Sequence, residues 1–465
     1  ALTHIKALTT GLSRRAAIQK QLLPVLLQWF TEGTDPDAAL LAFRRLSEDL
    51  GESHWYLRML RDSSGAAERM TKVLSNSRLA TGLFERIPEA AAWFEDAAFL
   101  QPQQPEILQA ELQAIGERQT SLEDSAASAR QVRRRETLRI AMGAVLGELS
   151  IDQIQLALSQ LSELYLQTIL GFVLNSKEHA QELQSIDFAI VAMGRFGGEE
   201  LGFGSDADIM YVYESKHDSD EAQRAAELVV SLIKKLSADN LLEFDIDIDL
   251  RPEGKNGAIV RSLASYESYY QRWADTWESQ ALLRARTIAG SEQLQQKFTE
   301  LINRYRYPAN LSLGAITEIR RIKARMESER LPQGADAKRH LKLGRGSLSD
   351  VEWLVQLYQL RFGSEQPQIQ TPRTLYALDA MVKGSLIDQS DAQVLSAAWI
   401  LASRVRSATV LWGNKKSDVL PTDRKHLEGI ARILEYPAGS AAQLETDYLA
   451  STRRARAVFE RLFFS

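Results

Sequence analysis

Apolar side chains recur at helical spacing along almost all of the first 180 residues. Over residues 151–165 they return every three or four positions, as on the buried face of an amphipathic helix. At the start of this segment, Ser150 and Gln153 have the spacing of a capping box, in which each side chain binds the backbone N–H of the other residue. The pattern predicts an almost wholly helical segment over residues 1–180.

The periodicity changes at about Asp187. Residues 188–193 form a short apolar run that ends at a glycine, which is typical of a buried strand. Residues 194–204 are rich in glycine, and a second apolar run follows at residues 209–213. We therefore predict two strands joined by a glycine-rich loop.

Beyond these strands, residues 220–239 have the spacing of an amphipathic helix. Residues 242–251 alternate strictly between apolar and polar side chains, so they predict a third strand. From about Tyr266 to the C-terminus the spacing is helical again.

These elements describe a predominantly helical α+β protein. A chain of 465 residues is long enough for about three domains. We expect a helical domain at residues 1–180, a small mixed-sheet domain at 181–290 and a helical bundle at 291–465. The chain begins with Ala1 rather than methionine, which indicates a fragment of a longer protein.

Two aspartates, Asp206 and Asp208, stand at the entrance to the second predicted strand. Residues i and i+2 of a strand project from one face, so we expect these carboxylates side by side. Two like charges so close repel unless a cation lies between them, and Mg²⁺ prefers such oxygen ligands. An isolated Asp-x-Asp pair more often marks a solvent-exposed turn before a strand, so the interpretation depends on the surrounding residues.

The third predicted strand carries Asp245, Asp247 and Asp249 on one face. Aspartate is a poor strand former, so three on one face need open water or a cation. One interpretation is an exposed edge strand that its charges protect from aggregation, and the other is a further metal ligand. An EF-hand calcium loop is excluded, because Leu250 occupies the position where that loop requires glycine.

The glycine-rich loop contains Gly202-x-Gly204-x-x-Ala207, which matches a dinucleotide-binding fingerprint by its letters alone. That interpretation fails, because an apolar strand follows where the fingerprint requires a helix. The loop is better described from Gly194, where a strand ends and glycines allow backbone N–H groups close to a ligand. A short helix that begins there would complete a binding site for phosphate groups.

Composition excludes several classes of protein. The net charge of −5 argues against a nucleic-acid-binding protein, and we interpret five arginines between Arg130 and Arg139 as a solvated helix face. There is no cysteine, which excludes disulfides, and the six histidines lack metal-binding spacing. We find no long apolar run and no signal peptide, so we expect a cytoplasmic protein that contacts no membrane.

Gly194, Asp206, Asp208 and Asp247 have the layout of the nucleotidyltransferase superfamily typified by DNA polymerase β, which this chain resembles. That layout has an apolar residue, a glycine and a small residue, then ten residues, two aspartates one position apart and a later carboxylate. Arg195 departs from it, because the superfamily usually has a small residue there.

Longer motifs resemble a narrower family, glutamine synthetase adenylyltransferase, whose loop carries Lys or Arg at the position of Arg195. The motifs are Met193-Gly194-Arg195-Phe196-Gly197-Gly198-x-Glu200-Leu201-Gly202-x-x-Ser205-Asp206-x-Asp208, Asp247-x-x-Leu250-Arg251-Pro252, Trp277-Glu278-x-x-Ala281-Leu282-x-Arg284-Ala285-Arg286 and Lys342-x-Gly344-Arg345-Gly346-Ser347-Leu348-Ser349-Asp350-Val351-Glu352-Trp353. Leu331-Pro332-x-Gly334-Ala335-Asp336 is similar to actinobacterial members.

The resemblance implies transfer of AMP from ATP to a tyrosine of glutamine synthetase, with release of pyrophosphate. It implies that Asp206, Asp208 and Asp247 are the catalytic residues and bind two Mg²⁺ ions. Residues expected to bind the nucleotide are Gly194, Arg195, Gly197, Gly198, Ser205, Arg251 and Glu278. Asp350 and Glu352 are positions associated with the family, without an assigned role.

Enzymes of this family have an adenylyl-removing half and an adenylyl-transferring half. Glu200-Leu201-Gly202-Phe203 and Thr276–Leu282 are similar to the transferring half. The alternatives are removal of AMP from the tyrosine by phosphorolysis at the same site, and a non-catalytic scaffold that binds nucleotide or a partner. Glutamine and PII-type signalling proteins regulate the family, and the sequence does not locate their binding sites.

Overall fold

The computed structural model describes residues 2–10, 14–51, 53–118, 121–216, 219–273, 275–331, 334 and 336–465. Pro332 and Ala335, from the motif similar to actinobacterial members, lie outside the described residues. The chain forms two compact units. Unit 1 comprises Ala1–Gln103, Arg134–Ala157 and Ser403–Leu449, and unit 2 comprises Gln104–Arg133, Leu158–Ala402 and Ala450–Ser465. The division into three domains that we expected from the sequence stays a prediction.

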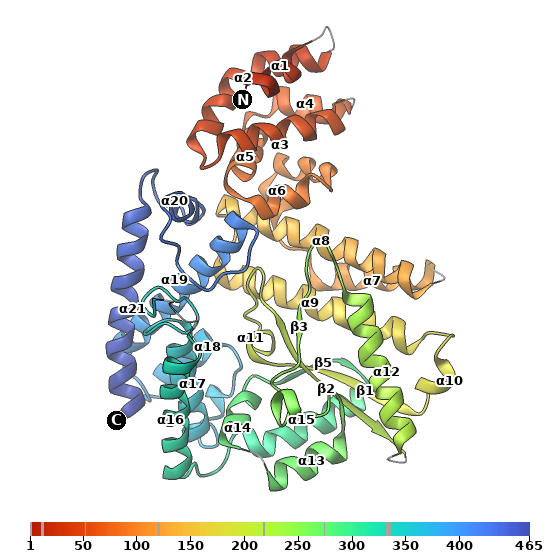
Figure 1. Ribbon diagram of the computed structural model, residues 1–465, viewed down its shortest axis with the longest axis vertical. Coiled ribbons are helices and arrows are strands. Elements are labelled where there is room, and N and C mark those ends of the chain that lie inside the picture. Colours follow the sequence, from red (N-terminus) through yellow and green to blue (C-terminus); the bar gives the residue numbers. More distant parts are fainter. Residues whose placement is uncertain are drawn as a thin grey trace. The chain divides into compact units, whose positions relative to one another are not determined.

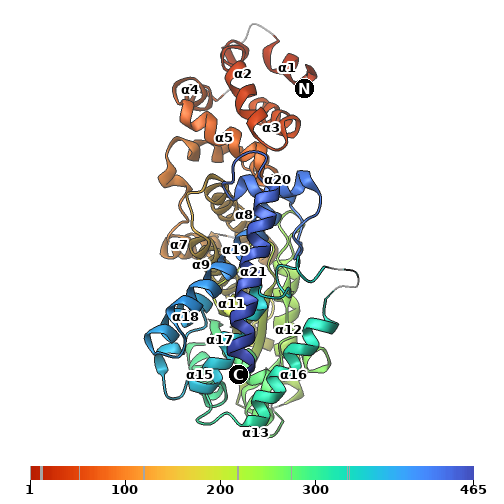
Figure 2. The same ribbon diagram turned by 90° about the vertical axis from the view of Figure 1, so that its left-hand side faces the viewer.

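Unit 1 is helical. Its helices are α1 (Leu2–Thr9), α2 (Arg14–Glu32), α3 (Pro36–Asp49), α4 (His54–Asp62), α5 (Ser64–Asn76), α6 (Arg78–Phe84), the 3-10 helices η1 (Pro88–Glu95) and η2 (Ala97–Leu100), and α20 (Arg424–Ile433). Helices α2, α3 and α5 pack against one another (Figures 1 and 2). In the interior, Phe30 of α2 packs edge-to-face on Phe43 of α3, with the ring centroids 6.0 Å apart. Four further helices have residues in both units: α8 (Leu122–Leu146), α9 (Ile151–Leu174), α19 (Gln389–Gly413) and α21 (Ala441–Phe464).

The predicted helical character of residues 1–180 is confirmed for the described residues. The capping box at the start of α9 is present as predicted. The Ser150 N–H donates to Gln153 Oε1 over 2.9 Å, and the Gln153 N–H donates to Ser150 Oγ over 3.3 Å.

The arginine cluster of α8 does not form the solvated face that we expected. The Arg133 guanidinium is buried, donates to the Leu242 carbonyl and lies 3.4 Å from the Asp239 carboxylate. Arg139 is also buried and donates to Glu136 Oε2 over 3.0 Å. The interpretation was wrong for these two residues because carboxylate and carbonyl partners compensate for the removal of their charges from water.

Unit 2 contains a mixed sheet of five strands (Figure 1). The strands are β1 (Ile186–Ala192), β2 (Ala207–Ser215), β3 (Ile246–Asp247), β4 (Arg261–Ser262) and β5 (Arg286–Gly290). Their order is β3-β2-β1-β5, and β4 also pairs with β2. Strand β1 is antiparallel to β2 and β5, whereas β3 and β4 are parallel to β2 and occupy successive parts of its other edge. The predicted α+β class, with a small mixed sheet in a mostly helical chain, is confirmed.

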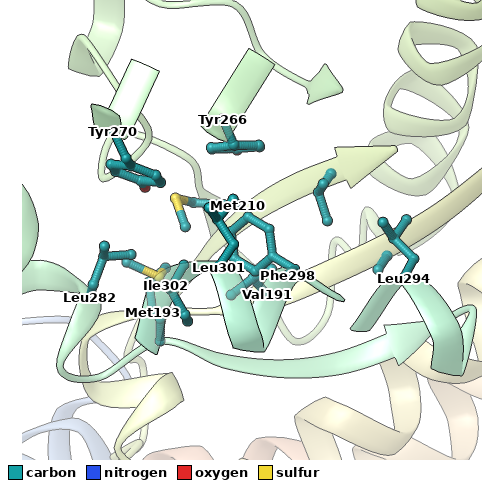
Figure 3. Close-up of a cluster of buried hydrophobic side chains, with 13 residues drawn as sticks. Val191, Met193, Met210, Tyr266, Tyr270, Leu282, Leu294, Phe298, Leu301 and Ile302 are labelled. Atoms are coloured by element: carbon teal, nitrogen blue, oxygen red, sulfur yellow. The ribbon is translucent and has the colours of Figure 1, made fainter. Parts of the chain in front are cut away.

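Helices cover this sheet. The helices of unit 2 are α7 (Pro105–Arg118), α10 (Ala180–Leu183), α11 (Gly194–Gly197), α12 (Asp220–Ser237), η3 (Gly254–Asn256), α13 (Leu263–Arg272), α14 (Thr276–Leu282), α15 (Glu292–Arg306), α16 (Leu313–Glu329), α17 (Leu348–Phe362), η4 (Pro367–Ile369) and α18 (Thr374–Lys383). Side chains of α13 and α15 meet Val191 and Met210 from the strands in one buried core (Figure 3). Tyr266 packs edge-to-face on Phe298, with centroids 5.1 Å apart, and its hydroxyl donates to the Tyr211 carbonyl.

The third and fifth strands differ from the sequence prediction. The alternating segment 242–251 forms only the two-residue strand β3, because the Asp247 carboxylate accepts a hydrogen bond from the Asp249 N–H and turns the chain. Strand β5 lies in a region that we expected to be helical. Its β-branched Thr287 and Ile288 were signals for it in the sequence, but pairing with β1 decides the strand.

Two described helices, α9 and α19, are long and apolar enough to cross a membrane by length and composition alone. This is weak evidence, because the core helices of globular proteins meet the same criterion. About half of the apolar window in each helix is buried within the protein, 50% in α9 and 56% in α19.

Candidate active site

Strands β2 and β3 bring together the three aspartates that the sequence indicated. In this parallel pair Asp208 lies directly opposite Asp247. The Ala207 N–H donates to the Asp245 carbonyl over 2.7 Å, and this hydrogen bond fixes the register of β2 against β3 at the residue that follows Asp206. Asp206 is exposed, whereas Asp208 and Asp247 are partly buried. The carboxylates therefore gather at one end of β2, where the glycine-rich loop joins it.

The Asp208 carboxyl is in an unfavourable environment for its charge. Its pKa is raised to about 7, chiefly by burial; the negative charges of Asp247 and Asp206 act in the same direction, whereas Lys342 and Arg284 oppose the shift. The repulsion identifies the three aspartates as neighbours. A cation placed among them would stabilise the charged form of Asp208.

The donor set fits Mg²⁺ in kind, since these three residues offer only carboxylate oxygens. In the part of the chain that the structure describes, no three carboxylate or imidazole side chains are close enough to hold a metal ion. One oxygen of Asp247 already accepts the Asp249 N–H over 2.7 Å. Binding of Mg²⁺ by Asp206, Asp208 and Asp247 therefore stays a prediction.

The glycine-rich loop packs directly against this carboxylate group. The Met193 N–H donates to the Asp208 carbonyl over 2.8 Å, and Gly194 follows with φ +52°. A Cβ at Gly194 would lie 2.3 Å from Asp208 Oδ2, and one at Gly197 would lie 1.7 Å from the Arg284 carbonyl oxygen. At Gly198 it would lie 3.0 Å from the Pro372 carbonyl. Glycine is required at Gly194 and Gly197 because the backbone approaches its neighbours too closely for a side chain.

Gly194→Ala will lower the free energy of unfolding by about 1–3 kcal/mol, because it combines a left-handed backbone with a clash against Asp208. Chemical denaturation measures the change. Gly171→Ala in α9 is the matched control, since a Cβ there meets nothing within 4 Å and should stabilise the helix slightly. Equal stability of Gly194→Ala and the wild type would contradict the close packing of the loop on Asp208.

Arg195, which we expected to bind phosphate, is buried beneath the loop. Its Nη1 lies 3.1 Å from Glu352 Oε1, and its Nε donates to the Glu200 carbonyl over 3.0 Å. Glu352 also accepts a hydrogen bond from Trp399 Nε1. Burial acts to raise the pKa of Glu352, but Arg284, Arg195 and Lys342 together hold it below its ordinary value. The described contacts of Arg195 thus tie the loop to α17.

A second buried pair lies beside the first. Arg284 Nη2 is 2.7 Å from Glu200 Oε2, and both side chains are almost fully buried. Glu200 also accepts hydrogen bonds from the backbone N–H and hydroxyl of Thr374 at the start of α18. Burial raises the pKa of Glu200, while Arg284 and Arg195 oppose the shift. Together the two pairs anchor the glycine-rich loop to the helices that follow the sheet.

The other predicted nucleotide-binding residues make different kinds of contact. Ser205 Oγ accepts the Gly202 N–H over 3.0 Å and is partly exposed beside Asp206. Arg251 is buried and donates to backbone carbonyls in the loop after β3, those of Ile248, Lys255 and Gly257. Glu278 closes a capping box at the start of α14, where it accepts from the Asp275 N–H and the Tyr269 hydroxyl. Contact of these three residues with nucleotide stays a prediction.

Asp350 belongs to a separate cluster and does not join the active-site carboxylates. Its carboxylate lies 2.5 Å from Lys323 Nζ and 3.0 Å from Arg456 Nη1, and it accepts the Gly346 N–H over 2.6 Å. Asp350 and Glu352 thus point away from each other on α17, as expected for residues two positions apart on a helix.

Comparison with known proteins places this geometry in a family. The family model described as glutamate-ammonia ligase adenylyltransferase matches residues 67–301, roughly half of the chain, and that range includes the glycine-rich loop and all three aspartates. The chain belongs to the glutamate-ammonia ligase adenylyltransferase family. A second family model, described as GlnD PII-uridylyltransferase, matches residues 320–463.

Curated relatives of this adenylyltransferase family align with the whole chain. Three proteins named bifunctional glutamine synthetase adenylyltransferase/adenylyl-removing enzyme are 56% identical in Leifsonia xyli, 46% in Streptomyces avermitilis and 40% in Mycobacterium tuberculosis. Each alignment covers 100% of this chain and 46–48% of the relative. The chain therefore spans about half the length of the curated relatives it matches.

Three residues near the carboxylates of this adenylyltransferase-family chain were absent from our predicted site. They are Glu200, Arg284 and Lys342, and each stands in a motif that carried the family resemblance. The charge of each residue, inside a motif that carried the resemblance, was the available signal. The sequence alone did not show that the last motif, some 140 residues beyond the aspartates, folds back beside them.

Proposed function

We propose that this chain transfers AMP from ATP to a tyrosine hydroxyl of glutamine synthetase and releases pyrophosphate, which lowers the activity of the synthetase in nitrogen control. The observation that carries the proposal is Asp208, which faces Asp247 across β2 and β3 and packs against the glycine-rich loop at Gly194. This arrangement lies in a chain of the adenylyltransferase family. The names of the relatives support both the acceptor and the reaction class.

In the proposed AMP transfer, each group of residues would have its own role. The tyrosine oxygen attacks the α-phosphorus, the bond from that phosphorus to the bridging oxygen breaks, and the electron pair leaves with pyrophosphate. Asp247 would accept the phenolic proton, since an unperturbed tyrosine titrates only near pH ~10. Backbone N–H groups of the loop from Gly194 to Gly198, with the Ser205 hydroxyl, would orient the phosphates.

Asp206, Asp208 and Asp247 would hold Mg²⁺, with two ions in the usual arrangement of such sites. When bound, the metal would polarise the phosphate and tyrosine oxygens. The chain's own contribution is to gather three carboxylates at the end of β2 and to hold them there despite their repulsion.

Mg²⁺ will raise the unfolding temperature of the wild-type chain, and Asp208→Asn will remove most of that response. A ligand that binds only the folded state stabilises it, and about 1 kcal/mol shifts the midpoint by roughly 2–4 °C. Thermal unfolding with and without Mg²⁺ measures the effect. Asp187→Asn, an exposed position on β1, should keep the full response. Equal shifts in wild type and Asp208→Asn would place the metal elsewhere.

The transferring reaction is favoured over the removing reaction by Glu200-Leu201-Gly202-Phe203 and Thr276–Leu282, which are similar to the transferring half. The names of the relatives contain both activities, so the removing reaction is the second candidate. There, phosphate would attack AMP-tyrosine, and ADP would leave with the freed tyrosine. A non-catalytic scaffold is disfavoured, because all three aspartates are retained.

Incubation of the chain with labelled ATP, Mg²⁺ and unmodified glutamine synthetase tests the proposal. We expect label on a tyrosine of the synthetase and pyrophosphate in solution. Incubation with adenylylated synthetase and phosphate tests the second candidate through formation of ADP. Label that reaches no synthetase in the first reaction, together with ADP in the second, would reverse the assignment.

The remaining partners follow the family. We propose glutamine synthetase as the protein substrate and the cytoplasm as the compartment. A PII-type signalling protein and glutamine would be the regulators, and the match of residues 320–463 to the GlnD PII-uridylyltransferase model supports the link to PII. We propose no nucleic-acid and no membrane partner, given the net charge of −5.

A further inference from the structure

The turn that precedes α17 is fastened to the first residues of that helix. The Ser349 N–H donates to the Lys342 carbonyl over 3.0 Å, and the Ser347 hydroxyl donates to the Leu341 carbonyl. On the other side of the turn, the His340 ring nitrogen Nδ1 accepts the Leu343 N–H over 3.0 Å. The backbone of Lys342 is therefore held in a fixed place relative to α17.

Helix α17 in turn is held against the glycine-rich loop. Glu352 lies one helical turn after Ser349, and its carboxylate contacts Arg195 in the loop at 3.1 Å. Arg195 directly follows Gly194, which packs on the Asp208 carboxylate. A continuous set of contacts thus places Lys342 beside the loop and the aspartates, although it is remote from them in sequence.

Lys342 differs from the other cations in this region. Its side chain is exposed, and within the described residues its ammonium forms no ion pair within 4 Å. Its charge still acts on both Asp208 and Glu352. Arg195 and Arg284, by contrast, are buried and engaged by Glu352 and Glu200. Of these three described cations, Lys342 is therefore the one whose charge is open to a ligand.

We infer that Lys342 binds the β- and γ-phosphates of ATP, the part that leaves as pyrophosphate. This inference rests on the proposed function. Within the described residues the ammonium forms no ion pair with Asp208, although its charge lowers the pKa of that carboxyl, so it remains available to a phosphate group bound beside the aspartates. A lysine ammonium is a compact phosphate-binding charge, and negative charge grows on the leaving group as the bond to the α-phosphorus breaks.

Binding of ATP and of AMP to wild type, Lys342→Met and Lys342→Arg tests the inference by calorimetry in the presence of Mg²⁺. AMP lacks the two phosphates that Lys342 would contact. We expect Lys342→Met to weaken ATP binding about 10- to 100-fold and to leave AMP binding unchanged, with Lys342→Arg restoring most of the loss. Lys338→Met is the control, because Lys338 is an exposed lysine four residues earlier.

The outcomes separate this inference from the proposed function. If the wild-type chain transfers AMP to glutamine synthetase but Lys342→Met binds ATP as tightly as the wild type, the role of Lys342 is overturned. The proposed function would still stand. An equal loss of ATP and AMP binding would also overturn it, since that pattern indicates a general disturbance of the site. A wild-type chain that neither binds ATP nor transfers AMP would overturn both.

Discussion

Asp206→Asn will abolish AMP transfer to glutamine synthetase and leave the fold intact. Asp206 is exposed and precedes the first residue of β2, and asparagine has nearly the same shape as aspartate, so we expect the fold to tolerate the change. In the proposed site, Asp206 would complete the carboxylate group with Asp208 and Asp247. A metal that polarises reacting oxygens is worth several kcal/mol, so we expect a loss of at least ~10³-fold in rate. Labelled-ATP assays measure the rate, and circular dichroism measures the fold.

The control for Asp206→Asn is the same substitution at Asp187, an exposed aspartate at the start of β1 in the same sheet. We expect Asp187→Asn to transfer AMP at the wild-type rate. Near-normal transfer by Asp206→Asn would remove this residue from the active site, and with it the interpretation of Asp-x-Asp as a metal-binding pair. A loss shared by both variants would indicate a general effect of charge on the sheet.

Much of the catalytic region could be predicted because its signals are local. The apolar run before Gly194 predicted β1, and the run after Asp208 predicted β2. The spacing of Asp206 and Asp208 then placed two carboxylates on one face. These inferences need only the two-residue period of a strand and the backbone freedom of glycine.

Features that depend on the partner chosen by a polar side chain could not be predicted in the same way. Arg195 stands in a loop suited to phosphates, yet its guanidinium contacts Glu352, which lies 157 residues farther along the chain. The strict alternation around Asp247 predicted a long strand, but a side-chain hydrogen bond to Asp249 turns the backbone after two residues. In both cases a polar side chain finds a partner within the protein, and periodicity carries no information about such partners.

Asp350 and Glu352 lie two residues apart in one motif, but their carboxylates contact different parts of the protein. Glu352 faces the glycine-rich loop through Arg195 and Arg284. Asp350 faces the opposite way, into a charge cluster with Lys323, Glu327 and Arg456. The side chains of Asp350 and Lys323 are each only 1% exposed. The sequence places both carboxylates in one motif, but only Glu352 adjoins the proposed catalytic residues.

Asp350→Ala will lower the free energy of unfolding by about 3–5 kcal/mol, because it leaves the buried Lys323 with one carboxylate, Glu327, instead of two, and removes one of the carboxylates that contact Arg456. Removal of one partner from a buried ion pair exposes the other to the full cost of desolvation. Chemical denaturation of the protein, monitored by tryptophan fluorescence or by hydrogen exchange of amides in unit 2, measures the change.

The matched control for Asp350→Ala is Asp379→Ala in α18. Asp379 pairs with Lys383 at 2.6 Å, nearly the 2.5 Å of Asp350 with Lys323, but those side chains are 64% and 74% exposed. Water screens such a pair, so we expect little measurable change from Asp379→Ala. The two substitutions remove the same side chain from ion pairs of nearly equal length, so a difference between them reports the burial of Asp350 together with its further contacts to Arg456 and the Gly346 N–H. Equal effects would contradict the assignment of Asp350 to a buried cluster that stabilises the fold.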